Sequence, residues 1–464
     1  MTSLTDDLAS VLGDALILEQ TERISRARDT WSRSQIAITG GRPEVAPVAV
    51  CAPDTTELLA EAVKVCRAHG APMIPRGGGS GVCGGVLASA ESVVLSTERM
   101  TGMRELSDAD LLATFGAGTN GLVAENNVAE HGLTIGHWPQ SIELSSVGGW
   151  VATRASGQYS TAYGNIEDMV YGLEAVLPDG SVYRSRNTPR AAAGPDLRHL
   201  LMGSEGVLGV VTEVTLSLRE QPEPGVRQAF HFADFSAGLA AIAAVMRQGW
   251  RPPVVRLYDG RESWRHFRDQ MPKGHCMLIF LHEGPPGLAP LQAAAVGALC
   301  ADGGGVEAPS EAVDRWFEHR NTVPTWDELL RQGLVSDTIE VAAPWSILPA
   351  VYNDVVEAMR AVPGVIAASG HSSHAYRSGA NLYFTVAAQP QDPSQFESTY
   401  DAYWNAAMSA VANLGVGVAH HHGIGRVRRG WMTSEVGQAG VDVLRALKRA
   451  LDPDGLMNPG VLVP

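Results

Sequence analysis

The sequence contains few cysteines, no basic stretch and no long apolar run. Its five cysteines are odd in number, widely spaced and without a Cys-x-x-Cys pair, which argues against a disulfide framework and against a thiolate zinc site. A formal net charge of −15 with no Lys/Arg run argues against a nucleic-acid partner. No run of about 18 uncharged apolar residues occurs, and the N-terminus lacks an export signal. We therefore expect a cytoplasmic protein with no transmembrane segment and at most peripheral membrane contact.

The length and composition are those of a globular protein with two domains. The 464 residues exceed one ordinary core, and 45% hydrophobic with 18% charged residues is a globular balance. Residues 55–70 place apolar side chains at helical spacing between a threonine and a glycine, which predicts a capped helix with Cys66 buried. Short apolar runs at 71–75 and 92–97 predict two strands.

The stretch between these strands, RGGGSGVCGG at 76–85, contains six glycines in ten residues. Glycine lets backbone N–H groups converge on an anion that larger side chains would block. A flexible linker is the alternative, but linkers seldom lie between two short apolar runs inside a domain. The spacing matches neither the Walker loop nor the Gly-x-Gly-x-x-Gly motif that opens into a helix. We therefore predict a phosphate cradle in a different nucleotide-binding fold.

The pattern of elements changes after residue 222. Before it, residues 171–185 read as two strands around a Pro-Asp-Gly turn, and residues 206–218 as a strand pair or a bent strand. The proline-rich stretch 219–228 marks the boundary. Beyond it, short strands alternate with longer helices, which predicts a sheet covered by helices. The strands expected there are 253–259, 276–283, 338–343 and 380–388, and the helices are 233–249, 287–303 and 346–362.

Three consecutive histidines, His420, His421 and His422, precede Gly-Ile-Gly and a cluster of arginines. Metal ligands, acid–base groups and a polar surface run are the three interpretations. Adjacent side chains on an extended segment point to opposite faces, which argues against a zinc or manganese site built on these histidines alone, and we expect no metal. An imidazole pKa near neutrality favours acid–base work.

Four segments together resemble the FAD-binding domain of the vanillyl-alcohol oxidase / p-cresol methylhydroxylase (PCMH) superfamily. They are PRGGGSG at 75–81, SSVGGWVATRASGQYSTAYGNIEDMV at 145–170, GSEGVLGVVTEVTL at 203–216 and DPDGLMNPG at 452–460. The resemblance implies an α+β fold with a PCMH-type FAD-binding domain of two α/β subdomains at 1–222. An inserted cap domain at 223–417 would hold an antiparallel sheet covered by helices, and residues 418–464 would return to the FAD site.

The same resemblance implies that the glycine loop binds the FAD pyrophosphate and that the other segments line the isoalloxazine and adenosine. The implied cofactor-binding residues are Pro75, Arg76, Gly77, Gly78, Gly79, Ser80, Gly81, Gly84, Gly85, Gln140, Ser141, Ser145, Ser146, Gly148, Gly149, Thr153, Ser156, Glu205, Gly206, Gly209, Val211 and Asn458. Some superfamily members attach the flavin to a histidine of this loop. Because the loop here contains none, we expect non-covalent FAD.

Within the superfamily, TRASGQYSTAYGNIEDMV and HHHGIG look most like alkyldihydroxyacetonephosphate synthase and its bacterial relatives. The rival branch is that of the D-lactate and D-2-hydroxyglutarate dehydrogenases. Tyr383 and His421 stand where the metal motifs of that branch have a histidine and a glutamate. The resemblance implies that His421 or His422 accepts a proton, that Tyr383 serves the leaving acid and the incoming alcohol, and that Arg256 anchors the substrate anion.

Each of these residues also has a structural alternative. Tyr383 could simply fill the buried face of a strand, and Arg256 could form an ion pair at a sheet edge. His374 and Arg377 are further candidates for the site.

The resemblance thus implies a flavoenzyme that replaces an acyl by an alkyl group on a dihydroxyacetone phosphate substrate, without net redox change. The alternative is an FAD-linked oxidase or dehydrogenase that passes a hydride from a D-2-hydroxy acid or an alcohol to flavin N5. A flavin-binding protein without catalysis is the third interpretation. The expected partner is a small-molecule or lipid-like anionic substrate, and a homodimer is compatible with the sequence.

Overall fold

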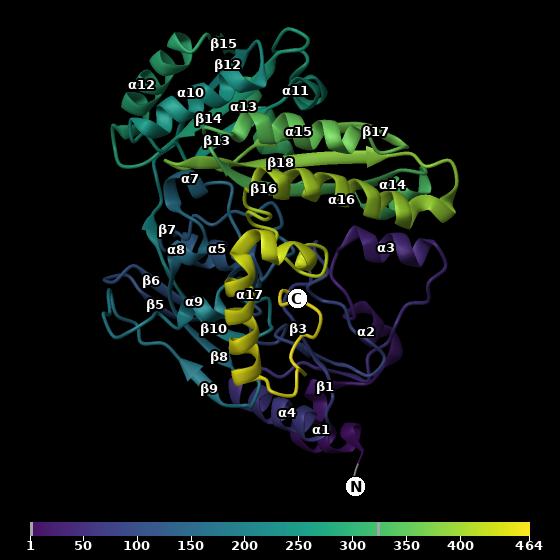
Figure 1. The fold of residues 1–464 in the computed structure, drawn as a ribbon. Helices are drawn as coiled ribbons and strands as arrows, with labels where there is room; N and C mark the ends of the chain where they lie inside the picture. Colours follow the sequence, from purple (N-terminus) through teal and green to yellow (C-terminus); the bar gives the residue numbers. More distant parts are fainter. Residues whose placement is uncertain (1–2, 323–324) are drawn as a thin grey trace.

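The computed structural model describes residues 3–322 and 325–464 and has the α+β architecture that the sequence predicts (Figure 1). Within these ranges the strands form sheets of four, five and seven strands and one two-stranded ribbon. The seven-stranded sheet and its helices lie above the smaller sheets in Figure 1. None of the helices described combines the length and the apolar character that a membrane crossing requires.

The four-stranded sheet carries the glycine-rich loop between its last two strands. Its strands, in spatial order, are β1 (Leu16–Ile17), β2 (Ala49–Cys51), β4 (Val93–Ser96) and β3 (Met73–Arg76). β2 and β3 run parallel to β4, and β1 runs antiparallel to β2. The predicted helix is α4 (Thr56–Ala68), capped by Thr55, and it packs with α1 (Leu4–Leu12) into one core. Cys66 is fully buried in that core, as predicted.

The five-stranded antiparallel sheet forms the second part of the predicted FAD-binding region. Its strands, in spatial order, are β5 (Met103–Ser107), β6 (Leu112–Gly116), β10 (Val210–Ser217), β8 (Val170–Val176) and β9 (Val182–Arg184). The run at 206–218 therefore contributes one strand, and two register shifts interrupt its pairing with β8. The ribbon pairs β7 (Leu133–Thr134) with β11 (Arg219–Glu220). The helices here are α5 (Gly121–Ala129), α6 (Val147–Thr153), α7 (Ser160–Tyr163), α8 (Ile166–Met169) and α9 (Arg198–Leu201).

The seven-stranded sheet is antiparallel throughout and contains the four predicted strands. In spatial order it consists of β15 (Val306–Ala308), β12 (Val226–Phe232), β14 (Cys276–His282), β13 (Val254–Tyr258), β17 (Val365–Ser372), β18 (Gly379–Ala388) and β16 (Val335–Pro344). The three predicted helices are α10 (Phe235–Arg247), α12 (Leu288–Asp302) and α15 (Leu348–Arg360), which share one core with the sheet. Two more helices, α11 (Gly260–Phe267) and α13 (Glu311–His319), pack against the opposite face of the seven-stranded sheet and form a separate core with it.

The C-terminal segment passes back over the smaller sheets (Figure 1). After α16 (Phe396–Leu414) the histidine loop leads into α17 (Met432–Leu451), which is kinked at Gly437. The N–H of Met73 then donates to the carbonyl of Leu456 at 2.7 Å, so the last residues lie beside β3. The remaining helices are α2 (Gln20–Ser25), α3 (Ser32–Thr39) and α14 (Trp326–Arg331). The division of the chain at residues 222 and 417 stays a prediction.

Candidate active site

The register of the seven-stranded sheet aligns polar side chains in one row. Glu340 on β16 is paired with Tyr383 on β18, Tyr383 with His371 on β17, and His371 with Tyr258 on β13. Residues directly opposite each other on neighbouring strands share a face of the sheet. Arg256 precedes Tyr258 by two residues and lies on that face as well. The row therefore presents a carboxylate, a phenol, an imidazole and a guanidinium side by side.

Tyr383, a site residue that the resemblance implies, lies against the histidine triplet 420–422. Its ring stacks on that of His371 at 4.7 Å between centroids, and its centroid is 5.9 Å from that of His421 and 5.4 Å from that of His422. Its hydroxyl donates to Oγ1 of Thr338 at 3.0 Å. Burial raises the pKa of Tyr383 to about 12, so the phenol keeps its proton near neutral pH.

Arg256 is held by its neighbours in the row. Its guanidinium donates to the Tyr258 hydroxyl at 2.9 Å and contacts Nε2 of His371 at 3.0 Å. Burial lowers the pKa of His371, so a neutral ring donates from Nδ1 to the Glu262 carboxylate at 2.8 Å. Burial opposes the charge of Glu262, but His371 and hydrogen bonds outweigh it and hold the pKa of Glu262 at about 2. Strand β13 is interior, and no carboxylate among the described residues pairs with Arg256, so the edge ion pair is wrong.

A second arginine, which the sequence did not single out, also lies near the ring of Trp316. The guanidinium carbon of Arg320 is 5.5 Å from the centroid of that indole, and the corresponding distance for Arg256 is 5.6 Å. Arg320 also donates to the Tyr159 hydroxyl at 2.7 Å and lies 4.9 Å from the ring of Trp138. Neither arginine has an ion pair with a carboxylate in the described part of the chain. Two such guanidinium groups suit an anion with several oxygens.

The triplet is held by a buried carboxylate that the sequence gave no reason to select. Glu340 accepts the backbone N–H groups of all three histidines, at 2.5, 3.3 and 2.7 Å in chain order. Glu340 and Arg428 are both fully buried, with 3.4 Å between guanidinium and carboxylate atoms. Burial opposes the ionisation of Glu340, but the Arg428 charge outweighs it and lowers its pKa below the usual range. The triplet is a bend rather than a strand, so the expectation that its neighbouring side chains diverge is wrong.

Three predicted cofactor residues meet directly beneath this loop. The Glu205 carboxylate accepts the N–H groups of Ile424 and Gly425, both at 2.7 Å. Burial raises the pKa of Glu205 to about 7. The Asn458 side chain donates to the carbonyl of Gly85 at 3.0 Å and to that of Glu205 at 2.7 Å. These hydrogen bonds join the glycine loop, the turn that contains Glu205 and the C-terminal segment.

The glycine loop fits the pyrophosphate of FAD. A Cβ on Gly77 would lie 2.4 Å from Oγ of Ser146, and a Cβ on Gly78 would lie 2.3 Å from the carbonyl oxygen of Leu144, so neither position has room for a side chain. The Gly78 N–H donates to Ser146 at 3.2 Å. The next N–H groups have no hydrogen-bond partner among the described residues and belong to Gly79, Ser80 and Gly81. Free N–H groups in a loop without side chains are what an anion requires.

The other predicted cofactor residues differ in how close they lie to this loop. Several lie in it, beside it or in the turn and helix that pack on it: Pro75, Arg76, Gly84, Gln140, Ser141, Ser145, Gly148, Gly149 and Gly206. Gly209 instead lies against Val176, Leu177 and Leu201. Three side chains are engaged elsewhere. The Thr153 hydroxyl donates to its own helix, Ser156 donates to Asn165, and Val211 belongs to the main core.

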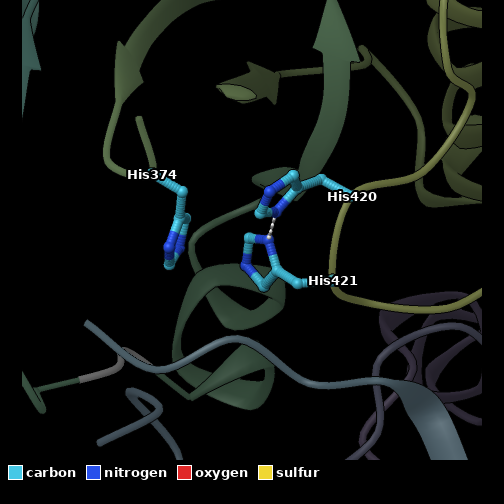
Figure 2. Close-up of side chains that lie close together, drawn as sticks. All are labelled: His374, His420 and His421. Atoms are coloured by element: carbon cyan, nitrogen blue, oxygen red, sulfur yellow. Dashed lines mark hydrogen bonds between the residues drawn. The ribbon is translucent and has the colours of Figure 1, made fainter. Parts of the chain in front are cut away.

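His374 joins two histidines of the triplet (Figure 2). Its Nδ1 lies 2.6 Å from Oγ of Ser160, and its ring centroid is 4.9 Å from that of His420 and 5.0 Å from that of His421. The Nδ1 atoms of His420 and His421 are 2.8 Å apart. Ligating nitrogens of the three rings lie within 4.8 Å of one another. Arg377, by contrast, is exposed.

Burial changes the acid–base character that the sequence suggested for the triplet. It lowers the pKa of His420 to about 4, that of His422 to about 3, and that of His421 well below the ordinary value. The near-neutral pKa assumed from the sequence is therefore wrong for these side chains, because desolvation disfavours the charged imidazole. All three rings are neutral near pH 7.

Comparison with known proteins agrees with this geometry. A model described as FAD binding domain matches residues 47–186, and one described as FAD linked oxidases, C-terminal domain, matches residues 221–462. The chain is 35% identical over its whole length to the uncharacterized FAD-linked oxidoreductase YgcU of Escherichia coli (strain K12), of which the match covers 98%. It is 27% identical to the alkyldihydroxyacetonephosphate synthase of Dictyostelium discoideum, over 98% of this chain and 80% of that protein.

A solved structure shows the same fold. p-Cresol methylhydroxylase with bound substrate matches with a TM-score of 0.77 at 16% identity, over 98% of this chain and 95% of that chain. The glycine loop lies within the matched FAD binding domain, which supports FAD as the cofactor, as predicted. The chain belongs to the family of FAD-linked oxidases and has the PCMH-type fold.

Proposed function

We propose that the enzyme acts on a small substrate carrying a phosphate group, and that it exchanges an acyl for an alkyl substituent as alkyldihydroxyacetonephosphate synthase does. One observation carries this proposal: the guanidinium carbons of Arg256 and Arg320 lie 5.6 and 5.5 Å from the Trp316 ring centroid, and neither has a carboxylate partner among the described residues. A phosphate monoester carries up to two negative charges and three acceptor oxygens, which suits two guanidinium groups better than a single carboxylate does.

The side chains around this anion site provide for proton transfer. Bound FAD supplies an electrophilic ring system that can take up an electron pair or a hydride. His422 is neutral, and its Nδ1 is buried 3.7 Å from the Glu340 carboxylate, so Nε2 is the atom that can accept the proton next to the substrate ketone. A substrate dianion nearby would favour the protonated imidazole. Tyr383 keeps its proton and can give it to the leaving acid.

Hydride transfer from a D-2-hydroxy acid or an alcohol is the second candidate. It is favoured by the FAD-linked oxidoreductase that is 35% identical to this chain over its whole length. The same anion site would then hold a carboxylate, and the same imidazole would take the hydroxyl proton. The two reactions differ in whether the flavin ends reduced.

An anaerobic incubation separates the two reactions. The FAD-loaded protein is mixed with acyl-dihydroxyacetone phosphate and a long-chain alcohol, and separately with a panel of D-2-hydroxy acids. Ether product with an unchanged visible flavin spectrum supports the exchange reaction. Bleaching by a hydroxy acid, reversed by oxygen or a dye and without ether, would overturn it.

The phosphate assignment has a test of its own. Arg320→Gln should raise the KM for the phosphorylated substrate and change kcat less, because the guanidinium binds a group that does not react. Arg315→Gln, in the helix that Arg320 directly follows, is the matched control, since its exposed partner Asp269 lies 4.0 Å away. An Arg320→Gln enzyme with the KM of the wild type would show that the substrate anion binds elsewhere.

A further inference from the structure

We propose that His374, His420 and His421 bind a divalent transition-metal ion of the zinc class. One ring nitrogen from each of the three lies within 4.8 Å of the other two, and the rings come together from two different segments of the chain (Figure 2). His374 follows strand β17, whereas the other two belong to the bend that Glu340 holds. The site therefore depends on the sheet and on the C-terminal loop being folded together.

Hydrogen bonds to groups outside the cluster engage one ring nitrogen on each of two histidines and leave the other nitrogen facing the cluster. Ser160 engages Nδ1 of His374, so Nε2 is available to a metal. The Tyr376 hydroxyl engages Nε2 of His420 at 2.6 Å and can donate to Asn165 at 3.2 Å, so Nδ1 of His420 is available. Metal-ligating histidines in proteins usually have such a partner on the second ring nitrogen. The cluster thus has two of its outer partners already in place.

His421 completes the set through the contact that links it to His420. Their Nδ1 atoms are 2.8 Å apart, so in the metal-free protein the two rings share one proton there. A cation can take the place of this proton once His421 carries its own proton on Nε2. No net proton release is needed, because both rings are neutral before and after the metal binds.

The charges around the cluster also permit a cation. Burial lowers the pKa of all three imidazoles, so they are unprotonated near pH 7 and do not repel a metal. The Glu340 carboxylate accepts the N–H groups of the bend and, at His421, favours a positive charge more than Arg428 opposes it.

The donor set selects the kind of metal. Three imidazole nitrogens without a thiolate or a carboxylate suit Zn²⁺, Co²⁺ or Ni²⁺, whereas Mg²⁺ and Ca²⁺ require oxygen ligands. Three protein ligands leave a fourth position open, as in catalytic rather than structural zinc sites. His422 is not part of the set and keeps its proposed role. The inference goes beyond the proposed reaction and holds whichever of the two reactions the enzyme performs.

Zinc binding is measured without turnover. FAD-loaded protein is dialysed against a chelator and then against buffer, and ZnCl₂ is titrated in by calorimetry, with MgCl₂ as the ion that should not bind. One equivalent of zinc should bind saturably. His374→Ala should abolish this binding, and Tyr376→Phe, which removes an outer partner, should weaken it roughly 10–100-fold.

His275→Ala is the control for adventitious binding. His231 and His275 form a second pair of histidines, with their Nδ1 atoms 2.9 Å apart, away from the site. Zinc that is lost in His275→Ala and kept in His374→Ala would overturn the proposal, as would the absence of saturable binding. FAD content reports whether each variant folds. If His374→Ala does not fold, zinc anomalous diffraction of the wild-type protein decides, because a peak away from the three imidazoles refutes the site.

Discussion

The ion pair beneath the histidine triplet gives a prediction with a magnitude. Glu340 and Arg428 are both fully buried, and their charged atoms are 3.4 Å apart. At an effective dielectric constant of about 20, two unit charges at this distance attract each other by about 5 kcal/mol. Arg428 has three further hydrogen bonds, to the carbonyls of Gly423 and Glu340 and to the Cys83 sulfur, but no second carboxylate within 4.0 Å in the described structure.

Glu340→Gln should therefore lower the free energy of unfolding by about 3–5 kcal/mol, because it leaves a buried guanidinium without a counter-charge. Arg428→Met should cost a similar amount by leaving the carboxylate unpaired. The double variant should be more stable than the sum of the two losses predicts, because neither charge then remains buried alone. Urea unfolding followed by circular dichroism at saturating FAD measures all three variants.

The control for these three variants is an ion pair on the surface, also formed by a glutamate and a basic residue. Glu61 and Lys64 are more than half exposed, and Glu61→Gln should change the free energy of unfolding by less than about 1 kcal/mol. If the losses from Glu340→Gln and Arg428→Met add within about 0.5 kcal/mol in the double variant, the two charges do not interact and the reasoning fails.

Further predictions concern the cofactor, the base and the acid range. Gly78→Ala should lower the FAD content, because its Cβ would lie 2.3 Å from a backbone carbonyl, whereas Gly430→Ala, with nothing within 4 Å, should not. Acid precipitation should release all flavin as FAD, and flavin left on the chain would show a covalent link. His422→Ala should keep FAD and reduce turnover by roughly 10²–10⁴-fold, and a smaller loss would exclude it as the base. Burial opposes the charge of Glu262, but His371 outweighs it and holds the pKa of Glu262 at about 2, below the ordinary 4.5. The stability that the ionised Glu262 contributes is therefore lost as pH falls toward 2. Glu262→Gln should make the melting temperature depend less on pH in that range. A pH dependence equal to that of the wild type would contradict this.

Local patterns in the sequence were sufficient for most of the fold. The helix at 55–70 and the strands around the glycine loop have clear spacing and end signals, and the structure confirms them. Strand β17 reads VIAASGHS, whose small side chains carry little alternation, and β12 begins inside the proline-rich stretch at 219–228. Both strands are formed by pairing with neighbours far along the chain, which a window of ten residues does not contain.

The site divides in the same way. The glycine loop, the histidine triplet and Tyr383 belong to contiguous motifs and could be selected by eye. Glu262 in α11 and Arg320 directly after α13 belong to no motif, and only the register of the sheet and the packing of α13 bring them to His371 and Trp316.

The histidine triplet shows why a correct local rule gave a wrong expectation. The rule that neighbouring side chains diverge applies to backbones in a regular extended conformation. Here one carboxylate, 80 residues upstream of His420, accepts three consecutive N–H groups and bends the segment around itself. The bend brings His420 and His421 to the same side, where they meet His374. A buried acceptor that collects consecutive N–H groups thus determines the direction of the side chains attached to them, and its own position is determined by the sheet.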